Sequence, residues 1–145
     1  MRDILAALAV AVCCLPAAGG FAPAGAFGAI AVGETANGVA KDGVAMGWSI
    51  SYSTQAEAEA VALKNCKNYK SAPKAALQCI LIGDVKANQC FAIALDPKPG
   101  TPGVGWAIAD DQSTAESVAM ANCKVTASSE RAQFCAVSDS KCDGK

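Results

Sequence analysis

The sequence contains an internal repeat, which limits the folds that this chain can adopt. Three segments of the first half recur in the same order in the second half. They are Phe-Gly-Ala-Ile-Ala-Val at 27–32 with Cys-Phe-Ala-Ile-Ala-Leu at 90–95, Gly-Trp-Ser-Ile at 47–50 with Gly-Trp-Ala-Ile at 105–108, and residues 58–67 with 115–124, which align without gaps. Chance explains an ordered series poorly, so the chain is expected to contain two copies of one unit.

Each copy begins with two predicted strands. The short apolar runs at 29–32 and 92–95 are typical of buried strands, and each is followed by a turn-rich stretch, 33–43 or 96–103. The second strand carries the Gly-Trp pair. In the first copy Trp48, Ile50 and Tyr52 alternate with serines, which is the period-two pattern of a half-buried strand.

A helix and a last strand complete each copy. The sequences Thr54-x-x-Glu57 and Ser113-x-x-Glu116 are capping boxes that predict helix starts. Small side chains then recur every four residues along one stripe of each helix, which lets the helix lie close to a sheet; they are Ala58, Ala62 and Cys66 in the first copy and Ala115, Ala119 and Cys123 in the second. The last strands are expected at 79–82 and, more weakly, at 134–137.

The predicted fold class is therefore α+β. Two tandem β-β-α-β half-domains, at 27–89 and 90–142, are expected to form one duplicated domain over residues 27–145. We expect a mainly antiparallel sheet with both helices on one face, related by an approximate two-fold axis. The strand order across the junction is left open.

Residues 1–26 have the pattern of a secretory signal peptide. Arg2 precedes an apolar run that ends at Pro16, and small residues lead to an expected cleavage after Ala26. The alternative of a membrane anchor needs an apolar run of about 20 residues, which Pro16 interrupts. A lipid anchor at Cys13 or Cys14 is a second alternative, although Val12 is larger than the residue such signals use. The mature protein is expected to be secreted or periplasmic, without a membrane span.

The cysteines predict a disulfide framework. Loss of Cys13 and Cys14 with the signal leaves six of the eight cysteines, an even number that permits 15 pairings. Equivalence of the copies favours two helix-to-strand bridges and leaves one remaining pair. The predicted disulfides are Cys66–Cys79, Cys123–Cys135 and Cys90–Cys142.

Several kinds of chemistry have no support in the sequence. The chain has no histidine and no Cys-x-x-Cys pair, so imidazole-dependent catalysis and the familiar zinc sites are not expected. A net charge of -1 with scattered lysines gives no basis for binding nucleic acid. No cofactor and no metal are expected. The adjacent Asp110 and Asp111 are the obvious pair for a carboxylate-dependent hydrolase, but acidic residues before a helix also stabilise its start.

Two features are candidates for binding. Trp48 and Trp106 occupy equivalent positions and would line a ligand groove, or else pack in the core. The stiff polar loop 96–103 has no match in the first copy, and its Asp96, Lys98 and Thr101 are candidate contact residues; the alternative is an ordinary long hairpin connection.

The apolar start at 27–32, the Gly-Trp strand and the helix ending in Asn-Cys-Lys, each present twice, resemble the bacterial secreted domain-of-unknown-function family 4189 over most of residues 27–142. The resemblance implies an exported, disulfide-bearing domain and supplies no catalytic residues. Some members of that family are thought to be envelope partners of secreted effectors. The expected function is a non-enzymatic binding module for an envelope or secreted protein, with an immunity-type protein and a carboxylate hydrolase as alternatives. The chain departs from the family pattern in its lipid-anchor region and in the polar segment 138–142.

Overall fold

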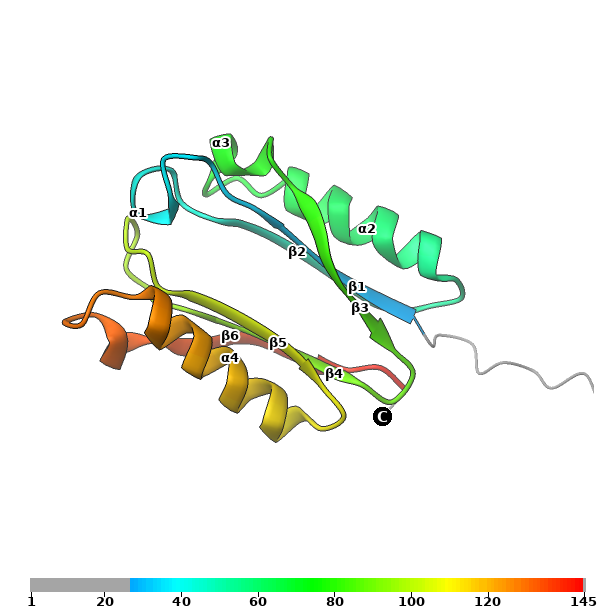
Figure 1. The fold of residues 1–145 in the computed structure, drawn as a ribbon. Helices are drawn as coiled ribbons and strands as arrows, with labels where there is room; N and C mark the ends of the chain where they lie inside the picture. The colour runs from blue at the N-terminus through cyan, green and yellow to red at the C-terminus, as the bar shows by residue number, and fades with distance from the viewer. Residues whose placement is uncertain (1–26, 145) are drawn as a thin grey trace, which may run out of the picture.

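A computed structural model describes residues 27–144 of the chain (Figure 1). The two predicted β-β-α-β units are present, with three short helical segments between the main elements. The first unit comprises β1 (Phe27–Gly33), α1 (Val39–Asp42), β2 (Ala45–Tyr52), α2 (Gln55–Lys67), α3 (Pro73–Ala76) and β3 (Ile80–Lys86). The second comprises β4 (Cys90–Leu95), β5 (Val104–Ala109), α4 (Gln112–Thr126), a 3-10 turn (Ala132–Phe134) and β6 (Ala136–Cys142).

Each unit forms its own three-stranded antiparallel sheet. The strand orders are β2-β1-β3 and β5-β4-β6, so the first strand of each unit is central. Both pairings of the first strand with the last contain an irregularity at the same place, between Ile30 and Ala31 and between Ile93 and Ala94. The α+β class, the antiparallel pairing and the duplication predicted from sequence are thus confirmed.

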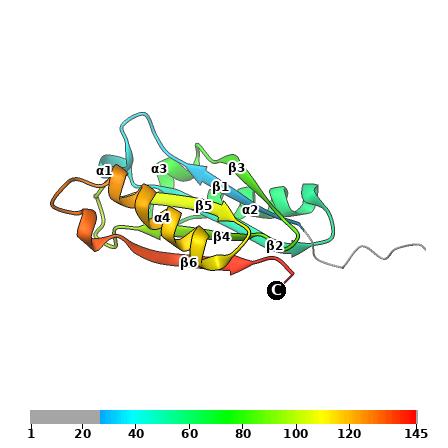
Figure 2. The ribbon, with the colours of Figure 1, turned by 60° about the horizontal axis from the view of Figure 1, so that its bottom comes forward.

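The arrangement of the layers differs from the prediction of one sheet with both helices on one face. Two sheets pack face to face, and α2 and α4 cover their opposite outer faces (Figures 1 and 2). The physical reason lies in the apolar residues that the helices do not cover. Ile30, Phe91, Ile93 and Val85 form a buried cluster between the sheets, and a single sheet with one bare face would expose them to water.

The central strands alternate small and large side chains, and this alternation separates the two kinds of interface. Ala29 and Ala31 lie in the cluster under α2, and Ala92 and Ala94 lie in the cluster under α4. The larger residues between them point to the opposite sheet. Successive strand residues face opposite sides of a sheet. Each central strand therefore packs closely against a helix with its small residues and forms a thicker core with the other sheet with its large residues.

The glycine of each Gly-Trp pair marks the closest approach of helix to strand. A methyl group at Gly47 would overlap the backbone nitrogen of Cys66 and the carbonyl of Ala62. Gly105 faces the backbone of α4 in the same way. Only glycine leaves room for this approach, which the small alanines of the two helices permit.

The helix starts agree with the prediction in one copy only. Thr54 caps α2 by accepting a hydrogen bond from the Glu57 backbone N–H at 3.2 Å. The capping residue of α4 is Asp111, whose carboxylate accepts from the Thr114 N–H at 2.8 Å, and Ser113 already lies inside the helix. The prediction of a Ser113 cap is therefore wrong. A carboxylate at the N-terminus of a helix favours the earlier start.

Three disulfides join the cysteines of the described region. They are Cys66–Cys79, Cys123–Cys135 and Cys90–Cys142, the pairs that the repeat predicts. The first two each tie the end of a helix to the segment that leads into the last strand of its unit. The third joins the start of β4 to the end of β6, so both ends of β6 are covalently held.

Asp143 connects the second unit to the first. Its side chain is fully buried, and one carboxylate oxygen accepts from both the N–H and the hydroxyl of Ser51, each at 3.2 Å. Ser51 has a φ of 62°, a left-handed conformation that is uncommon outside glycine. The contact follows directly after Cys142 and therefore places the C-terminal end of the second sheet against β2.

The predicted signal peptide, with Cys13 and Cys14, lies outside the described residues. Within residues 27–144 no helix has the length and apolar character needed to cross a bilayer.

Candidate functional site

The two sides of the sandwich are built from equivalent strands but are not equally filled. On one side β3 lies against β5 of the other sheet. Gly83 is so close there that an added Cβ would lie 2.8 Å from the Ile108 side chain and 3.7 Å from the Trp106 ring. Ile82, Trp106 and Ile108 belong to the apolar cluster between the sheets. This side is closed by apolar contact.

On the other side β6 faces β2, and the equivalent residues are polar. Gly83 pairs with Ile30 and Asp139 pairs with Ile93, so Asp139 occupies the position of Gly83 in the repeat. Ser138 takes the place of Ile82 at the shared irregularity. Because Gly83 has no side chain, Ile108 and Trp106 can pack closely against β3. The Asp139 carboxylate would be buried without a partner if β2 packed against β6 in the same way, and burying an unpaired charge is costly. This side therefore stays open.

A cavity of about 380 Å³ lies at this open side. Trp48 forms part of its wall and packs on Phe91 with ring centroids 5.1 Å apart. Asn65 of α2 donates a hydrogen bond to the Trp48 carbonyl at 3.0 Å and fixes the strand beneath the ring. Asp139 is exposed, lines the same cavity, and has no hydrogen-bond or ion-pair partner within the described part of the chain.

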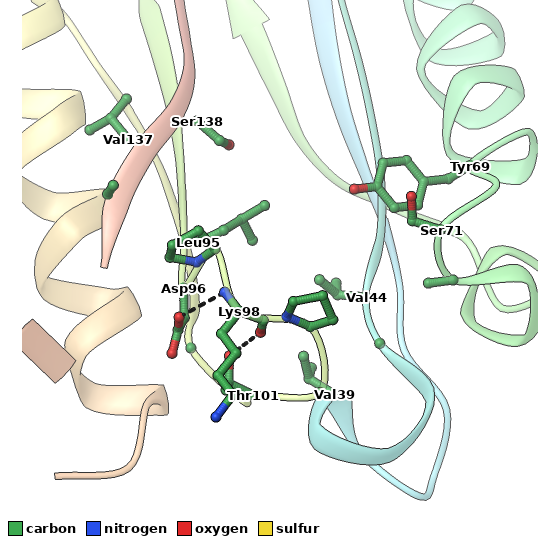
Figure 3. Close-up of a pocket in the computed structure, with 17 residues that line it drawn as sticks. Val39, Val44, Tyr69, Ser71, Leu95, Asp96, Lys98, Thr101, Val137 and Ser138 are labelled. Carbon is green, nitrogen blue, oxygen red and sulfur yellow. Dashed lines mark hydrogen bonds between the residues drawn. The ribbon is translucent and has the colours of Figure 1, made fainter. Parts of the chain in front are cut away.

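A second cavity, of about 480 Å³, continues from the first (Figure 3). The two share three lining residues, Tyr69, Leu95 and Ser138. In Figure 3 the hydroxyls of Tyr69 and Ser138 point into the gap from opposite units. We call the two cavities together the interunit cleft. Its walls come from both units, and the second cavity is mainly apolar, with Val39, Val44, Val137 and two prolines of the loop 96–103.

The loop 96–103 is held in place by hydrogen bonds within the loop and by two hydrogen bonds from Arg131. Asp96 accepts two hydrogen bonds from the Arg131 guanidinium, at 2.8 and 2.6 Å, and one from the Lys98 N–H at 3.0 Å. The Thr101 hydroxyl donates to the Lys98 carbonyl at 2.8 Å. The Arg131 hydrogen bonds hold the pKa of Asp96 well below its usual range. Asp96 is thus an ionised anchor of the loop.

The sequence-predicted binding residues are divided between these places. Asp96, Lys98 and Thr101 all line the second cavity, and Trp48 lines the first. Trp106 lies apart from them, on the closed side beneath β3. The equivalence of the two tryptophans in sequence therefore does not extend to their surroundings.

The structure places the predicted carboxylate pair, Asp110 and Asp111, at the start of α4. Both Asp110 and Asp111 are exposed. The two oxygens of Asp111 accept from the backbone and the hydroxyl of Thr114, at 2.8 and 2.7 Å, as expected of a helix cap. Asp110 accepts from the Gln89 amide at 3.5 Å. Residues 27–144 also contain no group of three or more histidine, cysteine or acidic residues arranged to hold a metal.

Sequence reasoning missed Tyr69, Asn65, Ser138 and Asp139 as parts of the site. The polar segment that begins at Ser138 stood out as a departure from the expected last strand, and this was the available signal. Aligning it on 82–85 of the first copy replaces Ile-Gly-Asp-Val by Ser-Asp-Ser-Lys. The replacement falls on the strand that borders the open side.

The family model described as a domain of unknown function, DUF4189, matches residues 27–142, which is nearly all of the described region. The chain belongs to the DUF4189 family. The match covers both units, so a DUF4189 domain corresponds here to the whole duplicated sandwich rather than to one half of it. No curated protein and no solved structure matched the chain.

Proposed function

We propose that this DUF4189 protein is an exported, non-enzymatic binding module, and that it recognises a protein of the cell envelope or the surrounding medium through the interunit cleft. The observation that carries the proposal is the broken symmetry of the sandwich. Equivalent strands close one side with apolar residues and leave the other open, with aromatic, apolar and polar groups in one continuous depression.

The composition of the cleft supports protein recognition. Tyrosine and tryptophan contribute large contact areas with few rotatable bonds, and they are enriched in protein interfaces. Apolar residues such as Val44 and Leu95 line the cleft beside them. The cleft also has rigid borders, because disulfides hold both ends of β6 and the Asp96–Arg131 pair holds the loop. A preformed surface loses little conformational entropy when a partner binds.

Export is supported by the three disulfides, which form and persist in oxidising compartments. The non-enzymatic assignment is supported by the lack of histidine in the chain and by the capping role of Asp111.

Capture of a partner from envelope and secreted fractions, with the oxidised protein as bait, tests the proposal. Ser138 points into the cleft, so Ser138→Glu places a charge there, and Ser117→Glu is the matched control at an exposed serine of α4 (Figure 3). We expect the original protein and Ser117→Glu to retain the same partner and Ser138→Glu to lose it. Equal retention by all three baits would contradict the assignment of the cleft. Turnover of a cell-wall or peptide substrate that Asp110→Asn abolishes would contradict the non-enzymatic assignment.

A further inference from the structure

The Trp48 end of the interunit cleft combines an aromatic ring with a carboxylate that has no partner in the described region. Asp139 and Trp48 line one cavity, and Trp48 is backed by Phe91 and held by Asn65. The charges elsewhere along the cleft are arranged differently. The Asp96 carboxylate is neutralised by Arg131, and Lys98 lies at the far end, in the other cavity.

We propose that this cavity is a cation subsite that takes the side chain of a lysine or arginine of the bound partner protein. The inference deepens the proposed function and rests on it for the source of the cation. The ammonium or guanidinium group would lie against the exposed part of the Trp48 ring and pair with Asp139. Tyr69 and Ser138 would border the apolar stem of the side chain.

The chemistry favours a cation over a neutral or anionic group. The face of an indole ring attracts positive charge, and tryptophan is the strongest of the aromatic residues in this respect. A carboxylate beside the ring adds an opposite charge and accepts hydrogen bonds from the same ligand group. An anionic ligand would instead be repelled by Asp139.

The repeat gives an internal comparison. At the equivalent place on the closed side Gly83 replaces Asp139, and one edge of the Trp106 ring lies against β3. The same Gly-Trp motif thus appears once beside a carboxylate and a cavity and once against a glycine of the facing strand. The carboxylate and the cavity occur together, as a binding site requires and as a packing position does not.

Titration of single-tryptophan variants tests the subsite. The chain has two tryptophans, so Trp106→Phe retains Trp48 alone and Trp48→Phe retains Trp106 alone. The probe is Nα-acetyl-lysine methylamide, with the norleucine derivative as its uncharged counterpart and spermidine as a free polyamine. We expect a saturable change in the fluorescence of Trp106→Phe with the lysine derivative, none with the norleucine derivative, and none in Trp48→Phe.

Charge variants then separate the subsite from general electrostatic attraction. In the Trp106→Phe background Asp139→Asn is expected to weaken binding about tenfold, since one charge-assisted contact is lost. Asp84→Asn removes the same charge from β3, where Asp84 accepts from Gln55 at 2.9 Å, and is expected to leave the affinity unchanged.

The inference is overturned by an absence of saturable binding or by equal weakening in both charge variants. It is also overturned by an equal response to the norleucine derivative, or by spermidine binding in preference to the lysine derivative. Its failure can be told apart from failure of the proposed function. A partner captured through the cleft without any lysine binding refutes the subsite alone. Lysine binding without a captured partner refutes the proposed function, and with it the partner protein as source of the cation, but leaves the cation subsite itself.

Discussion

Adding one methyl group at Gly47 or Gly105 is expected to destabilise the domain severely. The two glycines lie where α2 and α4 come closest to their sheets, and a Cβ at either position would overlap backbone atoms of the helix. Backbone atoms cannot turn aside as a side chain does. The helix would have to move outward by about 1 Å to restore ordinary contact, and its row of alanines would lose packing along the whole stripe.

The expected cost is about 3 kcal/mol for Gly47→Ala and about the same for Gly105→Ala, the upper end of the usual range for overpacked cores. Gly83→Ala is the matched control. It also adds a methyl group to a strand glycine, but the nearest atom is the end of the Ile108 side chain, at 2.8 Å, which is free to rotate away. The control is expected to cost less than about 1 kcal/mol.

Urea unfolding followed by far-ultraviolet circular dichroism measures these free energies without relying on the tryptophans next to the substituted residues. The three variants should be compared with all disulfides intact, so that the unfolded states match. If Gly47→Ala and Gly105→Ala are no less stable than Gly83→Ala, the close helix-to-strand packing described here is wrong.

Three further predictions concern other stabilising features. Removing the Cys90–Cys142 disulfide by replacing both cysteines with alanine should cost about 4 kcal/mol in urea unfolding, against about 3 for Cys123–Cys135, because their sequence separations are 52 and 12; the reverse order would contradict the chain-entropy argument. Ser49→Ala should cost about 1 kcal/mol by the same measurement, since it removes the hydrogen bond donated to the buried Ala58 carbonyl at 2.6 Å, and an unchanged stability would show that this bond contributes nothing. Acid should weaken the domain as the pH falls from about 4 to about 2. Hydrogen bonds from Asn37, Thr35 and Lys74 lower the pKa of Asp42 from 3.8 to about 2. The ionised Asp42 carboxylate therefore adds its full contribution to the free energy of unfolding above the pKa of the unfolded chain, and this contribution is lost as the folded carboxylate is protonated. Asp42→Asn should flatten the acid limb of a plot of urea midpoint against pH, and an unaltered limb would refute the assignment.

The sequence was sufficient to predict the units because each part of a unit has a local signal. The alternation around Trp48, the capping box at Thr54 and the four-residue spacing of Ala58, Ala62 and Cys66 all specify an element without reference to the rest of the chain. Pairing of the cysteines followed from the equivalence of the copies.

The packing of the units could not be predicted in the same way. Ile30 and Phe91 could pack against a helix or against a second sheet. Which of these occurs depends on contacts between distant segments, and such contacts leave no local sequence pattern. The alternation of alanine with larger residues in β1 and β4 was the one available indication, because it gives each strand two faces of different depth.

The candidate site was predictable in part for a related reason. The loop 96–103 and Trp48 stood out by composition and by the repeat, and both border the interunit cleft. Tyr69 and Asp139 come from segments without a motif and reach the cleft only because the sheets stack with β6 against β2. Trp106 shows the converse, since it is equivalent to Trp48 in sequence but its ring lies near Gly83 of β3 and lines neither cavity of the cleft.

We propose that the open side of the sandwich is its recognition surface. The most direct test follows the two tryptophan indole N–H signals in a ¹H–¹⁵N spectrum of the oxidised protein while the captured partner is added, with assignments from Trp48→Phe and Trp106→Phe. We expect the Trp48 signal to shift or broaden and the Trp106 signal to keep its position. A shift of the Trp106 signal with the Trp48 signal unchanged would contradict the proposal.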